Sequence, residues 1–391
     1  MTEAAVAIIQ TAAIQHNLQR VRAAAPGCRI MAVIKANAYG HGLIPIAKML
    51  NGVDALAVAR VSEGVQLREA GITERIVVLE GCSEAAEARE AVLHSLELVV
   101  HDPLHFEILE TLPGQDIVTV WLKLDTGMGR LGFEPAQLTA CRKRLDQITA
   151  VRPDVALMTH LACADDPDNS ATMEQVRQFG DAIDGFSGDV SIANSAGILL
   201  WPQTLEPSPV FDYQADNWVR PGVALFGASP VLGKNARELG LIPAMRFESH
   251  LIAVKTIKRG TAVGYGSDWR SKRDTVIGVV AAGYGDGYPR HLQSGTPLLV
   301  NGHRAALIGR VSMDMINVDL TDVPVAKVGD RVILWGGHLP IEEIAARAGT
   351  IPYELMCRIS QRVNHRFVDT PVADESSKSD RQQRTTHDPF A

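Results

Sequence analysis

Residues 29–42 read RIMAVIKANAYGHG, an apolar run that ends in Lys35 and leads into a loop with small residues, a tyrosine and two glycines. Seven more aliphatic or β-branched runs follow, separated by amphipathic stretches such as SEGVQLREAG. They are DALAVAR, RIVVLEG, LELVVHD, IVTVWLKL, DVALMTHL, VSIAN and WVRPGVALFG. This alternation is typical of repeated βα units. Eight strands in about 200 residues predict a closed (β/α)8 TIM-type barrel, and an open doubly wound sheet is the alternative.

Polar residues follow several of these runs directly. In a (β/α)8 barrel the chemistry lies at the carboxyl ends of the strands, where the βα loops converge. The side chains at such positions are Lys35, Arg130, His160, Asn194, Ser195 and Arg220. We therefore expect these distant residues to share one mouth of the barrel.

The sequence changes character from about residue 235. Alternating strands with Gly and Pro turns, such as TVIGVVAAGYGDGYP and DRVILWGG, predict a mostly β second domain. A short helix is expected in PIEEIAARAG, and the polar residues beyond Asp369 predict a disordered tail. The expected division is a barrel over residues 1–232, a β domain over 233–368 and a tail over 369–391, which fits a chain of 391 residues.

Composition and charge limit the classes of partner. The chain has a formal net charge of -7 and lacks a dense Lys/Arg run, which argues against a nucleic-acid partner. Its five cysteines form neither a CxxC pair nor an even disulfide framework, which fits a reducing compartment. No segment approaches the length of a membrane span, and MTEAAVAIIQ has no basic region before its apolar stretch. We expect a cytoplasmic protein without membrane contact.

The lysine and arginine of the expected mouth suit a carbonyl compound that carries a carboxylate. Lys35 can form a Schiff base there, although most lysines are solvated surface groups. The loop DTGMGRLG (125–132) contains GxGxxG, but the next strand ends in His160 rather than in the acidic residue of a dinucleotide site. We interpret it as a loop that holds Arg130 for a carboxylate. The stretch CADDPDN (163–169) has no His or Cys partner at ligand spacing, so we expect a loop and no metal.

Two further features extend this interpretation. Ser195 and the stretch RPGVALFG (220–227) end the last two strands, where barrels commonly build a phosphate site, and Gly222 would leave the backbone exposed for it. In the second domain Tyr265 and Tyr284 each lie between two glycines. The flanking glycines suggest exposed phenols able to act as an acid or base, whereas a tyrosine in a strand is more often an ordinary core or rim residue.

Together these segments resemble the bacterial alanine racemases, which depend on pyridoxal 5'-phosphate (PLP). The matching motifs cover nearly the whole chain, in that family's order. They are AVIKANAYGHG, LKLDTGMGRLGF, THLACAD, ANSAG, WVRPGVALFG, VGYGSDW, GYGDGYP, GRVSMDM and YELMCRIS. The resemblance implies a PLP-binding barrel, a β domain and a homodimer whose active sites combine one subunit's barrel with the other's β domain. It also implies interconversion of L-alanine and D-alanine, for D-alanine supply to the cell wall or for L-alanine catabolism.

The resemblance further implies roles for single residues. Lys35 carries PLP, Arg220 faces the pyridine nitrogen, and His160 orients both Arg220 and the catalytic tyrosine. The positions similar to the family's phosphate-binding residues are Tyr39, Ser195, Gly222, Val223 and Tyr353, with Asn194 beside them. An arginine cannot donate a full proton to the ring nitrogen, which weakens PLP as an electron sink and discourages transamination.

Racemisation needs one base on each face of the substrate carbanion. By the family's pattern, Lys35 abstracts the α-proton of the D enantiomer, and Tyr265 of the partner subunit abstracts that of the L enantiomer. Arg130 and the backbone of Met313 hold the substrate carboxylate. The remaining implied positions are Tyr284, which narrows the entrance, and Lys123, which resembles a lysine that is often carbamylated.

The chain departs from the family's pattern at two places. Phe226 replaces a tyrosine, and Asn364 follows Val363 where the family has Arg-Val-Pro-Arg; neither is a catalytic position, and both bear on local packing. Two rival functions are a PLP-dependent decarboxylase of the related barrel fold and a non-catalytic PLP carrier. The decarboxylase would present a carboxylate where this chain has Arg220, and the carrier would lack the β domain.

Overall fold

The computed structural model describes residues 4–208 and 210–369, which form two compact units. One unit is Ile14–Ile242, and the other combines Met1–Ala13 with Pro243–Ala391. The expected tail lies outside the described residues, apart from Asp369. The expected boundary also differs, because the first residues of the chain join the second unit rather than the barrel.

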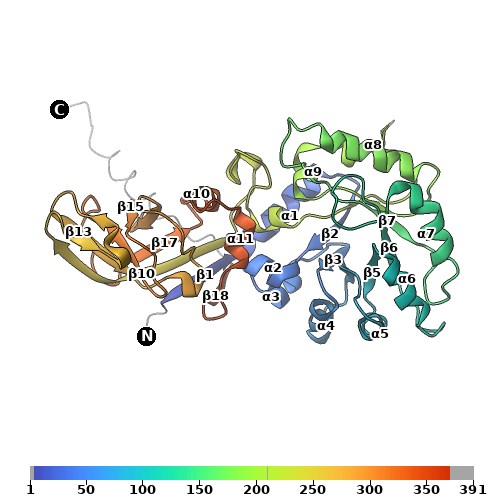
Figure 1. The fold of residues 1–391 in the computed structure, drawn as a ribbon, viewed down its shortest axis with the longest axis horizontal. Helices are drawn as coiled ribbons and strands as arrows, with labels where there is room; N and C mark the ends of the chain where they lie inside the picture. Colours follow the sequence, from blue (N-terminus) through green and yellow to red (C-terminus); the bar gives the residue numbers. More distant parts are fainter. Residues whose placement is uncertain (1–3, 209, 370–391) are drawn as a thin grey trace, which may run out of the picture. The chain divides into compact units, whose positions relative to one another are not determined.

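The first unit is a barrel of eight parallel strands (Figure 1), in the order β8-β7-β6-β5-β4-β3-β2-β9. Its strands are β2 (Arg29–Val33), β3 (Ala55–Val58), β4 (Arg75–Val78), β5 (Glu97–Val100), β6 (Val120–Lys123), β7 (Ala156–Met158), β8 (Val190–Ser191) and β9 (Trp218–Val219). Each coincides with one of the eight apolar runs. Parallel bridges from Val190 to Asn217 and from Asn194 to Arg220 join the segments of β8 and β9, which are the two ends of this order. The barrel is therefore closed, and the open sheet is excluded.

The helices of this unit either precede the first barrel strand, as α1 does, or occupy the connections between barrel strands. They are α1 (Thr11–Ala24), α2 (Lys35–Gly40), α3 (Leu43–Met49), α4 (Val61–Glu69), α5 (Ala85–Leu93), α6 (Pro103–Glu110), α7 (Leu138–Leu145), α8 (Ala171–Ile183) and α9 (Ser195–Leu200). Short 3-10 helices are η1 (Pro135–Gln137), η2 (Pro202–Thr204), η3 (Val223–Phe226) and η4 (Arg237–Leu239). The strands have nearly all their residues buried, because barrel strands are covered by helices outside and by packed side chains inside.

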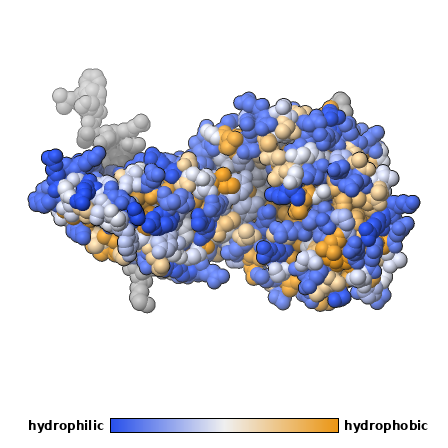
Figure 2. Space-filling model, in the orientation of Figure 1, coloured by the Kyte–Doolittle hydropathy of each residue, from blue (hydrophilic) through white to orange (hydrophobic). Residues whose placement is uncertain are grey.

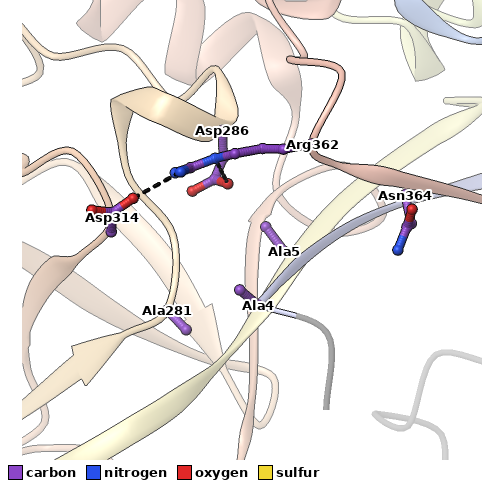
Figure 3. Close-up of a pocket in the computed structure, with 7 residues that line it drawn as sticks. All are labelled: Ala4, Ala5, Ala281, Asp286, Asp314, Arg362 and Asn364. Carbon is purple, nitrogen blue, oxygen red and sulfur yellow. Dashed lines mark hydrogen bonds and ion pairs between the residues drawn. The ribbon is translucent and has the colours of Figure 1, made fainter. Parts of the chain in front are cut away.

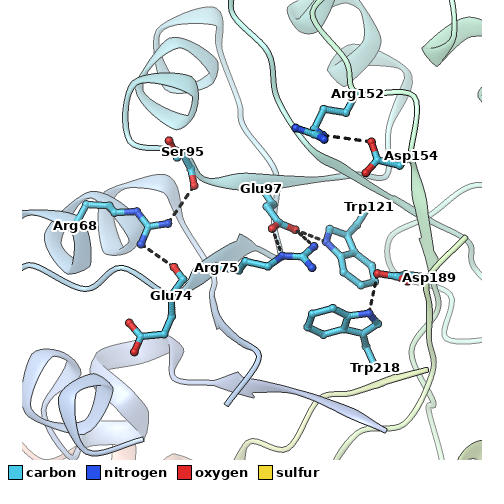
Figure 4. Close-up of polar contacts among 10 residues, drawn as sticks. All are labelled: Arg68, Glu74, Arg75, Ser95, Glu97, Trp121, Arg152, Asp154, Asp189 and Trp218. Carbon is cyan, nitrogen blue, oxygen red and sulfur yellow. Dashed lines mark hydrogen bonds and ion pairs between the residues drawn. The ribbon is translucent and has the colours of Figure 1, made fainter. Parts of the chain in front are cut away.

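A polar network fills the amino-terminal end of the barrel (Figure 4). The buried carboxylate of Glu97 accepts hydrogen bonds from Trp121 Nε1 at 2.8 Å and from Arg75 Nη2 at 3.0 Å. Trp218 Nε1 donates to Asp189 at 2.9 Å, and its ring meets Trp121 edge to face. These contacts lie at the end opposite to the expected site, where conserved features of barrels serve stability.

The second unit is built on an eight-stranded sheet, in the order β13-β16-β15-β14-β17-β10-β1-β18, with a further β13–β10 pairing. Its strands are β1 (Ala5–Gln10), β10 (Met245–Ile257), β13 (Thr275–Val280), β14 (Pro297–Val300), β15 (His303–Ile308), β16 (Ile316–Asp319), β17 (Arg331–Trp335) and β18 (Asn364–Val368). A separate hairpin contains β11 (Ala262–Val263) and β12 (Trp269–Arg270). Its helical elements are α10 (Ile341–Arg347), α11 (Pro352–Cys357), η5 (Tyr265–Ser267) and η6 (Tyr284–Asp286).

The strand β1 belongs to this sheet because both of its edges are paired there. It runs antiparallel to β10, with Ala5 opposite Ser249, and parallel to β18, with Val6 opposite Asn364. Five of its six residues are buried, as expected for a strand with a neighbour on each side. The expected short helix is also present as α10, which follows Pro340.

The visible faces of both units carry mostly hydrophilic residues with scattered apolar ones (Figure 2). Across residues 4–208 and 210–369, no helix has the length and apolar character needed to cross a membrane. In the same residues, no group of three or more His, Cys, Asp or Glu side chains is arranged to hold a metal ion.

Candidate active site

A left-handed turn follows Lys35 at the carboxyl end of β2. Ala36, Asn37, Ala38 and Tyr39 have φ angles between 51° and 54°, although none is glycine. A left-handed helical residue costs an L-amino acid other than asparagine roughly 1–2 kcal/mol, so Ala36, Ala38 and Tyr39 together store roughly 3–6 kcal/mol of strain. Strain of this size persists only where surrounding contacts hold it, which is typical of functional sites.

The end of this turn meets the residues expected to bind phosphate. A Cβ atom at Gly222 would lie 2.4 Å from Tyr39 Oη, so only glycine lets the tyrosine approach the backbone here. Ser195 Oγ accepts the backbone N–H of Gly222 at 2.9 Å and of Ala224 at 3.3 Å. Val223 follows at the start of η3. The turn after β2 and the segments after β8 and β9 thus form one cradle.

Asn194 supports this cradle from the end of β8. Its Oδ1 accepts the backbone N–H of Gly197 at 3.0 Å and thereby caps α9. Its side-chain nitrogen donates to the carbonyl of Leu161 at 3.4 Å. Asn194 thus fixes the helix that begins with Ser195.

Four cationic side chains converge on His160. Burial lowers the pKa of His160 well below its ordinary value, and the charges of Arg220, Lys123, Arg130 and Lys35 lower it further. Burial likewise lowers the pKa of Lys123 to about 8, assisted by Arg220, Arg130 and Lys35. The mouth of the barrel is therefore strongly positive, and it suits a ligand with anionic groups.

Arg220 is buried, and its guanidinium meets neutral partners. It donates to Ser191 Oγ, to the carbonyls of Thr159 and Ile192, and to His160 Nδ1 at 3.2 Å. Because His160 Nδ1 faces this donor, we assign the proton of the neutral imidazole to Nε2. Burial lowers the pKa of Arg220 to about 10, which leaves the guanidinium charged at neutral pH.

The loop that carries Arg130 is organised by Asp125. The carboxylate of Asp125 accepts backbone N–H groups from Gly127, Met128, Gly129 and Arg130, at 2.9 to 3.2 Å. Burial acts to raise the pKa of Asp125, but these four donors bring it below its ordinary value. The glycine-rich loop thus wraps around its own carboxylate, which fixes the backbone that carries Arg130.

Sequence reasoning missed two residues that hold this site. Gln175, on α8, donates to the carbonyl of His160 at 3.0 Å and accepts the N–H of Ala162 at 2.8 Å. Asp125 is part of the glycine-rich motif, but the motif alone did not indicate that its carboxylate organises the loop. Gln175 lies far along the chain in an ordinary amphipathic helix, so no local signal could have singled it out.

In the second unit, the expected tyrosines lie on exposed turns. Tyr265 begins η5, between the strands of the β11–β12 hairpin, and is 68% exposed. Tyr284 begins η6 and is also exposed. Its backbone N–H donates to the carbonyl of Ser312 at 3.0 Å, and that of Gly285 donates to Met313 at 2.9 Å. Tyr284 and Met313 are therefore brought together.

Arg362 joins these two loops (Figure 3). Its guanidinium donates to Asp286 and pairs with Asp314, each at 2.8 Å, and it donates to the carbonyl of Met313 at 3.3 Å. Arg362, Asp286 and Asp314 line a pocket of about 220 Å³. Tyr353, the remaining expected residue of this unit, is the second residue of α11.

The two departures from the family's pattern have different neighbours. The ring of Phe226 stacks on His41 at 4.5 Å and lies 5.0 Å from the ring of Tyr39. This substitution therefore touches the strained turn directly. Asn364 begins β18 and pairs with Val6 at the edge of the sheet.

Comparisons with known proteins match both units. The family model for the alanine racemase N-terminal domain matches residues 9–230, and that for the C-terminal domain matches residues 244–367. The chain belongs to the alanine racemase family. The alanine racemase of Shewanella sediminis is 47% identical over 355 residues, which cover 91% of this chain and 96% of that protein. That of Vibrio cholerae is 47% identical over 362 residues, with 92% and 97% covered.

Solved alanine racemase structures share the fold. The biosynthetic alanine racemase of Pseudomonas aeruginosa superposes with a TM-score of 0.87 at 41% identity, covering 94% of this chain and all of that one. The alanine racemase of Bartonella henselae, which has covalently bound pyridoxal phosphate, gives a TM-score of 0.82 at 28% identity, with 93% and 99% covered. The expected fold class and family are confirmed, and the matches favour an alanine racemase over a decarboxylase.

Proposed function

We propose that this chain interconverts L-alanine and D-alanine with PLP attached to Lys35. The observation that carries the proposal is one barrel mouth where Arg220 contacts His160 Nδ1 at 3.2 Å and the charges of Lys35, Lys123 and Arg130 act on the same imidazole. A phosphorylated cofactor and an amino-acid carboxylate would balance this charge. Family membership supplies the reaction, and the geometry supports the residues that perform it.

The cradle beside the strained turn fits the phosphate of PLP. Tyr39 and Ser195 offer hydroxyl groups, while Gly222 and Val223 offer backbone at a point where a Cβ atom would collide. Asn194 fixes this region, and Tyr353 of α11 is proposed as a further phosphate ligand. Bound PLP supplies an electrophilic carbon and an electron-accepting ring, which acidifies the α-proton of an attached amino acid.

Arg220 is proposed to face the pyridine nitrogen. Its guanidinium retains its proton at neutral pH, and its other donors are occupied by backbone carbonyls, a serine and His160. A donor that keeps its proton gives the ring a hydrogen bond without a full positive charge. This arrangement favours return of a proton to Cα over transamination.

Lys35 Nζ and Tyr265 Oη are proposed as the two bases. Each can take a proton from Cα or deliver one, and inversion requires that they act from opposite faces. Arg130 and the backbone N–H of Met313 hold the substrate carboxylate, and Tyr284 narrows the entrance.

The exposure of Tyr265 supports a homodimer. This phenol is 68% exposed in a single chain, with Met313 and Tyr284 also exposed in the same unit. Large apolar and aromatic side chains exposed together often mark an interface. We propose that a second copy supplies Tyr265 to the barrel site, so each active site is composite.

Lys123 is a candidate for carbamylation. Its pKa of about 8 leaves a fraction of the amine neutral at neutral pH, and it lies among three other cations. The Lys123 ammonium first loses one proton, and the neutral Nζ then attacks CO₂, forms a carbamate and releases a second proton, so an anion replaces a cation beside Arg130. Density for a carbamate at Nζ in a crystal would support this modification, and a bare amine would exclude it.

The proposed compartment is the reducing cytoplasm. All five cysteines are free thiols, and none lies in a disulfide. Cys28 and Cys82 are the clearest examples of structural thiols, since burial raises their pKa to about 11 and about 12.

Solvent-deuterium exchange tests the proposed reaction. Purified protein with PLP is incubated with L-alanine or D-alanine in D₂O, and products are separated by chiral chromatography while CO₂ is measured. Alanine of both hands carrying deuterium at Cα is expected. Release of CO₂ without inversion would support the decarboxylase, and bound PLP without any exchange would contradict the proposal.

A further inference from the structure

The left-handed turn after Lys35 needs an external restraint. Ala36, Asn37, Ala38 and Tyr39 all have positive φ angles, a conformation that non-glycine residues keep only when their surroundings enforce it. Lys35 directly precedes the turn and Tyr39 ends it. Whatever holds the turn therefore sets the direction of both side chains.

Some of the restraint comes from the turn and its immediate continuation. Asn37 Oδ1 accepts the backbone N–H of Leu43 at 2.8 Å, and the N–H of Gly42 donates to the carbonyl of Asn37 at 3.0 Å. His41 donates through its ring nitrogen toward the carbonyl of Tyr39 at 2.9 Å. These contacts close the turn on itself, and the N–H of Ala38 donates to the carbonyl of Ile34 at 2.9 Å, but none of them ties the turn to a neighbouring βα loop.

Glu63 makes that attachment. This residue lies in the first turn of α4, and its Oε1 accepts the backbone N–H of Ala36 at 2.8 Å. Its Oε2 accepts the N–H of Ala59 at 2.8 Å and of Arg60 at 3.2 Å. One carboxylate therefore bridges the loop after β2 and the loop after β3.

We infer that Glu63 is a positioning residue for Lys35 and Tyr39. The N–H that it binds belongs to the peptide group directly after Lys35, so releasing that group frees the backbone angles on either side of it. The strained residues then relax toward right-handed or extended conformations, which moves Tyr39 away from Gly222. This inference rests on the proposed role of Lys35 as the PLP attachment site.

The chemistry of a carboxylate suits this position. An ionised Glu63 has acceptors only, and it can satisfy three N–H donors at once. Glutamine has the same shape but turns an NH₂ group toward one set of donors. Glu63→Gln loses one set of these bonds and the charge that strengthens the other, so it weakens the restraint with little change in volume.

Glu87 provides a matched control. It occupies the first turn of the next barrel helix, α5, and accepts the N–H of Ser83 at 2.7 Å and its hydroxyl at 2.8 Å. Glu87 thus performs the same capping chemistry without contact to a strained turn. Both variants replace a capping carboxylate by an amide, but only Glu63→Gln changes a side chain that binds the Ala36 N–H in the wild type.

The test measures amide hydrogen exchange in the apoprotein, the rate of PLP uptake by absorbance, and the thermal midpoint. In Glu63→Gln we expect exchange at Ala36 to accelerate about 10- to 100-fold, as loss of a hydrogen bond to a charged group implies. Uptake of PLP should slow about tenfold. Glu87→Gln should match the wild type in both. If Glu63→Gln does not fold, Glu63→Asp keeps the charge, shortens the reach, and should give smaller changes of the same sign.

Three results would overturn the inference. Unchanged exchange over residues 36–39 would show that Glu63 does not hold the turn. Faster exchange with normal uptake would show that the turn does not position Lys35. Acceleration throughout the barrel with a lower thermal midpoint would assign Glu63 to general stability. A Lys35→Ala variant that still binds PLP covalently would instead contradict the proposed function, whatever Glu63 does to exchange.

Discussion

The polar network at the amino-terminal end of the barrel yields a quantitative prediction (Figure 4). Glu97→Ala removes the carboxylate that accepts hydrogen bonds from Trp121 and Arg75. We expect the barrel to lose stability while the activity per folded molecule is kept. The network lies at the end of the barrel opposite to Lys35, so the loss should not reach the site.

The size of the stability loss in Glu97→Ala depends on how exposed Trp121 and Arg75 are. The indole N–H of fully buried Trp121 loses its acceptor, and such an unsatisfied group costs roughly 1–3 kcal/mol. The Arg75 side chain is 39% exposed, so water replaces much of the lost pair and its share is about 0–1 kcal/mol. The free energy of unfolding should fall by roughly 1–4 kcal/mol in total.

Urea unfolding followed by tryptophan fluorescence measures this change, because Trp121 and Trp218 lie in the network. The matched control is Glu110→Ala, which breaks a two-bond pair with Arg144 in which the side chains are 45% and 38% exposed. That change should lower the free energy of unfolding by less than Glu97→Ala does, because water replaces an exposed ion pair. Equal losses in the two variants, or lost racemisation in a stable Glu97→Ala protein, would refute the reasoning.

The remaining predictions concern the site and the pH dependence of folding. Lys35→Ala should abolish both the absorbance of covalently bound PLP and racemisation, and covalent PLP in this variant would contradict the attachment site. Burial and the neighbouring His101 lower the pKa of His105 to about 4, against about 6.5 when unfolded, so the unfolded chain binds the extra proton and stability falls as pH drops between these values. The slope attributable to His105 should be small between pH 7.5 and 6.5, approach about 1.4 kcal/mol per pH unit below pH 6.5, and vanish in His105→Asn, measured by urea unfolding at pH 7.5, 6.5 and 5.5; an unchanged slope would exclude it. Arg362→Lys loses the guanidinium that joins Asp286 to Met313, so the KM for alanine should rise about threefold to tenfold with a smaller change in kcat. A large loss of kcat at constant KM would contradict that assignment.

The barrel was predictable because each of its strands is an apolar run bounded by a helical stretch. RIMAVIK and IVTVWLKL contain β2 and β6 in full, and both strands are buried. The resemblance to a known family also predicted that Arg220, His160 and Lys123 belong to one active site. These features can be predicted from the sequence because an apolar run is a local pattern and because the site residues lie in motifs that the family shares.

Other features depended on contacts that the sequence does not display. The apolar stretch in β1 pairs with β10 and β18, which are more than two hundred positions away, so its membership of the second unit required the folded structure. The left-handed turn contains Ala, Asn, Ala and Tyr, whose ordinary preference is right-handed. Glu63, which holds the start of this turn, resembles any acidic residue in the first turn of a helix.

The claim that Lys35 and Tyr265 act from opposite faces is tested most directly by enantiomer-specific exchange. Tyr265→Phe holoenzyme is incubated in D₂O with each enantiomer separately, and deuterium at Cα is measured at early times. The account predicts that exchange of L-alanine falls about 100-fold or more relative to exchange of D-alanine, because Lys35 still serves the D enantiomer. Equal loss of exchange for both enantiomers would contradict the assignment of Tyr265 as the base for one face.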